Sequence, residues 1–187
     1  MAERFFAVRD DLAHSQIAHQ YCLLLMKKEG GDRRIVEPAV ILHDVGWSKL
    51  NPEQIKKAFG VRASGEEAQQ LNRIHEVEGA AIAGQLLESL GYEPLLIEKI
   101  TGMIEYHDSG NNPGSLEEKI LKDSDRLWRY SPLGFWKERE RQRLPPLELF
   151  RHLETRRLGW FFTKTALNLS EEELKNRAQE IANRKGQ

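Results

Sequence analysis

The sequence is poor in cysteine, with Cys22 the single example among 187 residues. An internal disulfide is therefore excluded, and so are zinc ribbons and redox sites built from cysteine pairs. Cys22 lies in the apolar run YCLLLM, a setting that predicts a small buried thiol rather than a reactive one.

Long apolar runs and an excess of either charge are also missing. No apolar stretch approaches the roughly 20 residues that a membrane-spanning helix needs. The first residues, MAERFFAVRDDLAHSQ, show neither the apolar core of a signal peptide nor the bias of a transit peptide. Lysine and arginine number 28 against 29 acidic residues, so the net charge of −1 gives no basic field for nucleic acid or an anionic membrane. We therefore expect a cytoplasmic protein that binds neither.

Strand signals are weak, because Val, Ile and Thr do not alternate over any length and no Asn-Gly or Asp-Gly turn occurs. Apolar residues recur at helical spacing instead, between glycines, prolines and capping residues. We predict an all-α fold of about eight helices, over 10–29, 38–46, 51–60, 64–90, 94–107, 115–128, 144–168 and 170–184. The boundaries rest on Pro38 and Gly46, on the capping-box pairs Ser64–Glu67 and Ser115–Glu118, and on a turn at 168–170.

Ionisable residues interrupt the apolar faces of several expected helices. The stretch AVILHDVGW carries the adjacent pair His43-Asp44 inside an apolar run, and Gly46 is expected to end that helix. Buried carboxylates and histidines are costly when unpaired, but they become favourable if they share a metal ion. Helix bundles hold such sites where residues of separate helices converge in the core. The other candidates each lie in a different expected helix: His14, His75, His107 and Asp125.

This ordered set resembles the HD-domain metal-dependent phosphohydrolases. DLAHSQIAHQYCLLLMKKEGGD is similar to the family's first helix, AVILHDVGW to its central signature, and KDSDRLW to its closing aspartate helix. RIHEVEGAAIAGQLL and ITGMIEYHD resemble the extra histidine segments of subfamilies with a larger pocket or two metals. The resemblance covers about 10–130. It implies an HD-domain helical bundle, with 1–187 as a single domain whose C-terminal helices, 131–187, pack on the motif-bearing part.

The resemblance also implies roles for individual residues. His14, His43, Asp44 and Asp125 would bind a first metal ion, and Asp44 would also be catalytic by orienting a metal-activated water that attacks phosphorus. His75 and His107 would hold a second metal or the phosphate. By their charge and their nearness in sequence to these residues, Lys49, Arg73 and Arg126 are candidates for phosphate binding, with an ordinary surface ion pair as the alternative for each. The implied cofactor is a divalent ion (Mn, Fe, Co, Ni, Zn or Mg), one or two per chain. The implied partner is a small phosphorylated substrate, such as a nucleotide, and the chain could form a homodimer.

One departure from the family keeps other functions open. Some relatives place a glutamate a turn past the His-Asp pair, where it assists the attacking water, whereas here VGWSK follows. Glu76 and Glu78 are conceivable replacements without further support. A metal- or nucleotide-binding sensor without turnover is therefore one alternative, and an HD-type di-iron oxygenase is another.

The remaining polar and aromatic groups have plainer interpretations. His19 and His152 are expected at the surface, and KERERQR at 137–143 is typical of a solvated helix face. Asp123 is expected to support the site or to face solvent, because it lies two residues before Asp125 and points elsewhere on the helix. The aromatic group Trp128, Tyr130, Phe135 and Trp136 predicts core packing more readily than the wall of a base-binding pocket.

Overall fold

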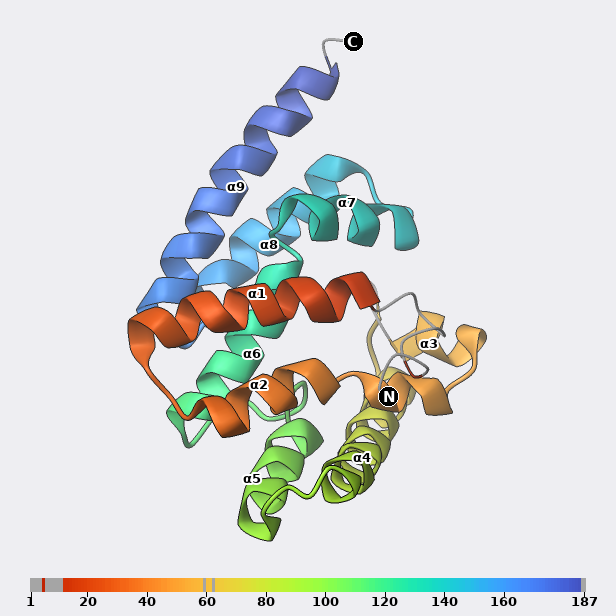
Figure 1. Cartoon of the computed structure of the whole chain (residues 1–187). Coiled ribbons are helices and arrows are strands. Elements are labelled where there is room, and N and C mark those ends of the chain that lie inside the picture. Colours follow the sequence, from red (N-terminus) through yellow and green to blue (C-terminus); the bar gives the residue numbers. More distant parts are fainter. Residues whose placement is uncertain (1–4, 6–11, 59, 62, 186–187) are drawn as a thin grey trace.

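The computed structural model describes residues 5, 12–58, 60–61 and 63–185 (Figure 1). Over these residues the chain is all-α without a strand, which confirms the predicted fold class. Nine α-helices and one 3-10 helix are described there, against the eight helices expected. They are α1 (Leu12–Glu29), α2 (Arg33–Leu42), η2 (Val45–Lys49), α3 (Pro52–Ala58), α4 (Glu66–Ser89), α5 (Pro94–Glu105), α6 (Leu116–Trp128), α7 (Pro132–Arg141), α8 (Pro146–Trp160) and α9 (Lys164–Lys185).

The capping residues at two helices act through their side chains. Ser115 precedes α6 and its hydroxyl accepts a hydrogen bond from the Glu118 amide at 3.1 Å, as its sequence predicts. The same arrangement at Ser131, which accepts from the Gly134 amide, begins α7, a helix in a region where we expected a break. Gly91, with φ +73°, follows α4 in the left-handed conformation that ends helices.

The helix before the His-Asp pair begins earlier than expected. Asp32 caps α2, and its carboxylate accepts a hydrogen bond from the Arg34 amide at 2.9 Å. Pro38 therefore lies inside α2 rather than in its first turn, so the prediction of a helix start there was wrong. The helix ends at Leu42, and Gly46 belongs to the separate 3-10 helix η2.

Two other boundaries were also misplaced. Gly65 stands at the N-cap of α4 and no side chain caps that end, so Ser64 does not form the expected capping box. Helix α9 continues without interruption through 168–170, and the actual break between α8 and α9 lies at 161–163. There the Thr163 hydroxyl accepts a hydrogen bond from the Ala166 amide at 3.2 Å, which supplies the cap that propensity alone did not reveal.

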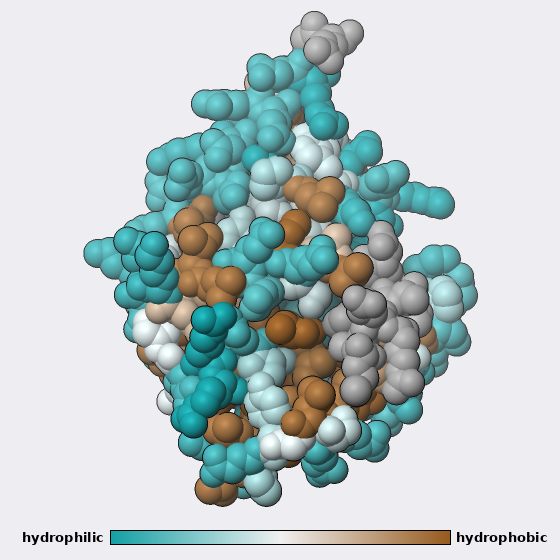
Figure 2. All heavy atoms as spheres, in the orientation of Figure 1, coloured by the Kyte–Doolittle hydropathy of each residue, from teal (hydrophilic) through white to brown (hydrophobic). Residues whose placement is uncertain are grey.

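The main apolar core lies where α1, α2, α4, α5 and α6 meet, and it includes Cys22 as a fully buried thiol. Burial raises the pKa of Cys22 to about 12, in agreement with an inert role. A second apolar cluster, Tyr130, Phe135, Leu144, Leu149, Leu153, Leu174 and Ile181, joins α7, α8 and α9. On the face seen in Figure 2, hydrophilic side chains cover the protruding end of α9 and hydrophobic ones form separate small patches.

Hydrogen bonds tie the C-terminal helices to the rest of the chain. The Tyr21 hydroxyl on α1 donates to Glu173 on α9 at 2.8 Å, and the Thr165 amide donates to Glu29 at 3.1 Å. Figure 1 shows α9 passing the end of α1 and α6 before it extends away from the bundle. That 1–187 forms one domain stays a prediction. None of the helices that the structure describes is both long and apolar enough to span a membrane.

Candidate metal centre

The His43-Asp44 pair lies in the turn between α2 and η2, where the backbone changes direction. His43 is the C-cap of α2 and Asp44 is the N-cap of η2, and both are buried. Neighbours on a straight helix point about 100° apart, so a helix end is what allows both side chains to face one point. The sequence predicted this bend, although not the residue that permits it.

Gly46 is required by close packing and not by chain termination. A Cβ at Gly46 would lie 1.9 Å from the His75 carbonyl oxygen and 2.5 Å from the Gly79 nitrogen. The backbone of η2 therefore rests directly on α4 at the turn that carries His75. The expectation that Gly46 ends the helix was wrong, and its role is to bring the His-Asp pair and His75 together.

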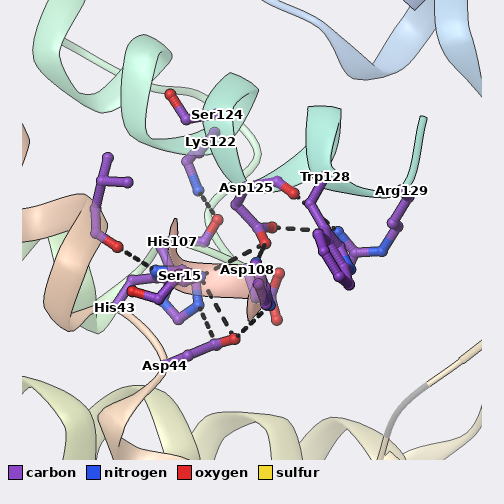
Figure 3. A network of polar contacts seen from close by, with 12 residues as sticks. Ser15, His43, Asp44, His107, Asp108, Lys122, Ser124, Asp125, Trp128 and Arg129 are labelled. Atoms are coloured by element: carbon purple, nitrogen blue, oxygen red, sulfur yellow. Dashed lines mark hydrogen bonds and ion pairs between the residues drawn. The ribbon is translucent and has the colours of Figure 1, made fainter. Parts of the chain in front are cut away.

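Four of the sequence-predicted ligands converge, and Figure 3 shows three of them, His43, Asp44 and Asp125, facing one another. His14 on α1 bridges the two carboxylates, with Nδ1 3.2 Å from Asp44 Oδ2 and Nε2 2.9 Å from Asp125 Oδ1. His43 Nε2 lies 3.5 Å from an oxygen of each of the same aspartates. The compact buried cluster is thus formed by side chains from three elements: α1, the turn after α2, and α6.

His75 and His107 complete the cluster from α4 and from the end of α5. Their Nε2 atoms face each other at 3.3 Å, and they lie 3.8 and 3.6 Å from Asp44 Oδ1. Asp108 extends the group, with Oδ2 3.7 Å from His75 Nε2. Asp108 was not among the predicted ligands, although His107-Asp108 repeats the His-Asp dipeptide of 43–44 and could have signalled it.

The donor set fits one or two divalent ions. His43 and His107 each place Nδ1 2.7 Å from a backbone carbonyl, of Val40 and Ile104. The proton on Nδ1 then belongs to that hydrogen bond, so Nε2, once deprotonated, turns its lone pair toward the cluster, which is the usual arrangement of a metal-binding histidine. Three overlapping groups have ligand atoms within 4.8 Å of one another: His14–His43–Asp125, His43–Asp44–His107 and His75–His107–Asp108.

The electrostatics of the cluster match the needs of a cation. Burial alone would lower the pKa of His43, but Asp44 and Asp125 outweigh it and raise the pKa to about 9. The pKa of His107 is likewise raised against burial, by Asp44 and Asp108. Burial opposes ionisation of Asp125, yet Arg129 and the nearby histidines hold its pKa well below the usual range. The Asp125 carboxylate is thus ionised, and the cluster attracts positive charge, whether protons or metal.

Trp47 explains the part of AVILHDVGW that the family pattern left open. Its indole Nε1 donates a hydrogen bond to Asp44 Oδ1 at 2.9 Å, and its ring stacks on His75 at 3.9 Å between centroids. Trp128 stacks on His14 in a similar way, at 5.2 Å. Of the four aromatics considered for a base-binding pocket, Tyr130 and Phe135 lie in the second apolar cluster, and Trp136 donates to Glu180.

The glutamates considered as helpers of an attacking water do not reach the cluster. Glu76 is buried and accepts hydrogen bonds from the Asp108 and Ser109 amides, both at 2.9 Å, so it positions the turn that carries Asp108. Glu78 is half exposed and faces Lys49 at 3.7 Å. From the other side, the Lys122 ammonium donates to the His107 carbonyl at 2.6 Å. The acid that remains beside the cluster is Asp108.

Asp123 is a structural residue. It is buried and accepts hydrogen bonds from the Phe162 amide at 3.0 Å and from the amide and hydroxyl of Thr163 at 2.8 and 2.7 Å. The solvent-facing alternative for Asp123 was therefore wrong. Its carboxylate fastens the break before α9 to α6, two residues from Asp125.

The candidate phosphate-binding residues separate into two kinds. Lys49 faces Glu78 in a surface ion pair, and the half-buried Arg73 guanidinium is engaged by the buried Glu76 and by Glu105. Arg126 instead lines a cleft of about 230 Å³ beside the cluster. The same cleft is lined by His152, whose expected solvated position was wrong: it is half-buried, and burial with Arg156 and Arg129 lowers its pKa. Within 137–143, Glu138 is also buried rather than solvated.

Comparisons with known proteins agree with this geometry. The family model for the HD domain matches residues 12–130, well over half of the chain, and the chain therefore belongs to the HD domain family. A crystal structure of a predicted HD superfamily hydrolase from an uncultured Thermotogales bacterium has the same fold, with a TM-score of 0.64 and 21% sequence identity. The alignment covers 97% of this chain and 86% of that one. No match is found among curated proteins.

Proposed function

We propose that this protein is a metal-dependent phosphohydrolase that cleaves a phosphate ester or anhydride of a small phosphorylated metabolite, with nucleotides as the expected class. The observation that carries the proposal is the convergence of six buried His and Asp residues from five elements on one cluster: His14, His43, Asp44, His75, His107 and Asp125. The membership in the HD domain family and the likeness to a predicted hydrolase support it.

The residues of the cluster would have distinct roles in binding metal and orienting water. His14, His43, Asp44 and Asp125 would hold one divalent ion, and His75, His107 and Asp108 would hold a second, with Asp44 between them. The chemistry that such ions supply is activation of water and neutralisation of charge on the phosphoryl oxygens. Trp47 fixes the Asp44 carboxylate by its hydrogen bond to Oδ1, so Asp44 is preorganised to orient the attacking water.

The two alternatives are weaker but differ in what they would show. A sensor would retain a ligand tightly without turnover. This alternative is considered because the glutamate that some relatives place after the His-Asp pair is absent here. A di-iron oxygenase would need iron in the purified protein and oxygen consumption with substrate. The complete ligand set favours hydrolysis over a sensor, because a domain that only binds a ligand does not need every group of a catalytic centre.

The test combines elemental analysis with a substrate panel. We expect one or two divalent ions per chain, and phosphate release from phosphomonoesters, nucleoside di- and triphosphates or cyclic dinucleotides assayed with Mn²⁺, Co²⁺, Ni²⁺ and Mg²⁺. Asp44→Ala should lose both metal and activity, since it removes a group placed between all the histidines. Full activity and metal content in Asp44→Ala would refute the mechanism. If no substrate in the panel releases phosphate and the protein retains a bound ligand, the sensor is favoured.

A further inference from the structure

A basic cleft adjoins the histidine–aspartate cluster, and three arginines line it. Arg126 and Arg129 come from α6 and its C-cap, and Arg156 comes from α8. The cleft and the cluster share a wall, because Asp108 lines the cleft while its Oδ2 lies 3.7 Å from His75 Nε2. Arg129 connects them a second time, with Nη1 3.4 Å from Asp125 Oδ2, as Figure 3 shows.

Arg126 is a buried cation with no carboxylate beside it. Its side chain is 7% exposed, its guanidinium donates to the Trp160 carbonyl, and it lies over the Phe162 ring at 5.0 Å. Among the residues that the structure describes, Arg126 forms no ion pair with a carboxylate. A buried charge without a direct counter-ion is costly, and an anionic ligand would relieve that cost.

The other two arginines gather around the same indole. Arg156 lies 5.2 Å and Arg129 5.6 Å from the centre of the Trp160 ring. Arg156 is exposed and makes no ion pair within the described part of the chain. Guanidinium groups repel one another, yet their planar forks match the oxygens of phosphate.

The acids of the cleft do not neutralise this charge. Glu138 also lines it, but it is already engaged by Arg141, by Gln142 at 2.7 Å and by Trp128 at 3.1 Å. Asp108 faces the histidines. His152, the remaining titratable group there, has its pKa lowered and is neutral at pH 7. Arg129 is paired with Asp125, whereas Arg126 and Arg156 leave an excess of positive charge beside the cluster.

We propose that this arginine cleft binds the second phosphate of a substrate that carries a phosphate chain, while the phosphate to be cleaved lies at the histidine–aspartate cluster. The inference rests on the proposed function and narrows its substrate class to phosphoanhydrides. Water adds across the P–O–P link: its oxygen bonds to the phosphorus at the cluster, and the bridging bond breaks with its electron pair on the leaving phosphate. The water protons pass to the phosphate products and solvent, while the arginines neutralise the leaving group.

In this proposal the C-terminal helices take part in binding the phosphate chain of the substrate. Arg156, His152 and Trp160 belong to α8, outside the 12–130 match to the HD domain. The family segment supplies the cluster together with Arg126 and Arg129, and the segment that follows it closes the cleft. Specificity for a phosphate chain would then be a property of this chain's own C-terminal part.

The test compares an anhydride with a monoester in the full-length protein. Inorganic pyrophosphate and p-nitrophenyl phosphate are assayed with Mn²⁺ for the wild type, Arg156→Gln, Arg156→Lys and the matched control Arg151→Gln, an exposed arginine of the same helix. We expect Arg156→Gln to lower the ratio of kcat/KM for pyrophosphate to that for the monoester about tenfold, the loss of one charge-assisted contact. Arg156→Lys should recover part of it, and Arg151→Gln should leave both substrates unaffected.

A binding measurement separates this proposal from the proposed function. Calorimetry with methylenediphosphonate, which cannot be hydrolysed, should show about tenfold weaker binding to Arg156→Gln than to the wild type and Arg151→Gln. Weaker binding to Arg156→Gln supports the cleft proposal even if no substrate is hydrolysed. An absence of hydrolysis would refute only the proposed phosphohydrolase activity. If the monoester is hydrolysed but Arg156→Gln and Arg151→Gln behave alike in both assays, the cleft proposal is overturned and the phosphohydrolase stands.

Discussion

At the scale of single residues, this site is determined as much by the groups behind the ligands as by the ligands. Asp44 is held by the Trp47 indole, and the turn that carries Asp108 is held by Glu76 and Lys122. Such supporting contacts fix the orientation of a ligand and tune its charge. They also distinguish two aspartates that stand two residues apart in α6, because Asp125 faces the cluster and Asp123 faces the break before α9.

The two kinds of aspartate can be told apart by mutation. We expect Asp108→Asn to lower the metal content per chain with little change in stability, since the amide is a poorer ligand at the edge of the cluster. Asp123→Asn should keep the metal but lower the free energy of unfolding by about 1–3 kcal/mol, because an amide nitrogen would meet the amides of Phe162 and Thr163. Elemental analysis measures the metal content of the two variants, and urea denaturation measures their stability. An unchanged metal content in Asp108→Asn would show that Asp108 is not a ligand.

The metal-free protein should lose stability as the pH rises from neutral. The pKa of His43 is raised in the fold from 6.5 to about 9, so its protonated form stabilises the fold fully below pH 6.5. That stabilisation, on the order of 3 kcal/mol, disappears as the pH passes through 9. We expect Tm in chelator to fall between about pH 6.5 and 9.5.

Saturating Mn²⁺ provides the control for this titration. Metal ligands must be deprotonated histidines, so the increase in Tm on adding metal should grow over the same pH range. A flat Tm in chelator across this range would show that the carboxylates do not hold protons on His43.

At the scale of elements, the site depends on a close backbone contact between η2 and α4. The adjacent pair His43-Asp44 can face one cluster only because η2 lies against the backbone of α4, and Gly46 is the residue at that contact. Two elements distant in sequence are thus brought within van der Waals contact by the absence of one side chain.

Gly46→Ala tests this contact. The added Cβ would overlap the His75 carbonyl, so we expect a loss of about 3 kcal/mol or more of stability. Gly102, inside α5, offers open space to an added Cβ, with no atom within 4 Å, so Gly102→Ala should stabilise by about 0.5–1 kcal/mol. Thermal unfolding of the two variants measures the difference, and equal effects at both sites would show that η2 can move away from α4 at little cost.

How much the sequence could predict also depends on the element. The candidate ligands were named from the ordered set of His and Asp residues and its resemblance to the HD family. Most of the helices, and the cap at Ser115, follow from apolar spacing and local hydrogen bonds. The start of α2 could not be predicted in this way, because Pro38 is a strong local signal for a helix start but lies inside this helix. The break before α9 was not predicted, because the turn that carries its capping residue, Thr163, is held by Asp123, forty residues earlier in the chain.

The basic cleft was the least predictable part of the site. Arg129 stands four residues after Asp125, a spacing at which an ion pair on one helix face is expected. Arg156 and Trp160, however, come from α8, and nothing local in RHLETRRLGW indicates that this helix lies beside α6. Such a pairing is set by packing of the whole chain and not by the pattern of either helix.

At the scale of the whole molecule, the C-terminal helices are joined to the family segment by polar contacts as well as apolar ones. Tyr21 reaches Glu173, and Arg126 donates to the Trp160 carbonyl. Ala166 of α9 also lies in the main core. The segment that carries the candidate metal ligands therefore rests against α8 and α9 through groups that would lose their partners if those helices were removed.

We therefore expect 1–187 to unfold in a single cooperative transition and 1–130 alone to be unstable. Truncation at 130 leaves Asp123 and Arg126 without their partners and exposes the apolar surface that α9 covers. The shorter chain should aggregate or show a much broader thermal transition by circular dichroism, and it should bind less metal because α6 carries Asp125 beside Asp123. If 1–130 kept the helicity, the Tm and the metal content of the full chain, the C-terminal helices would be an independent unit and the single-domain prediction would be wrong.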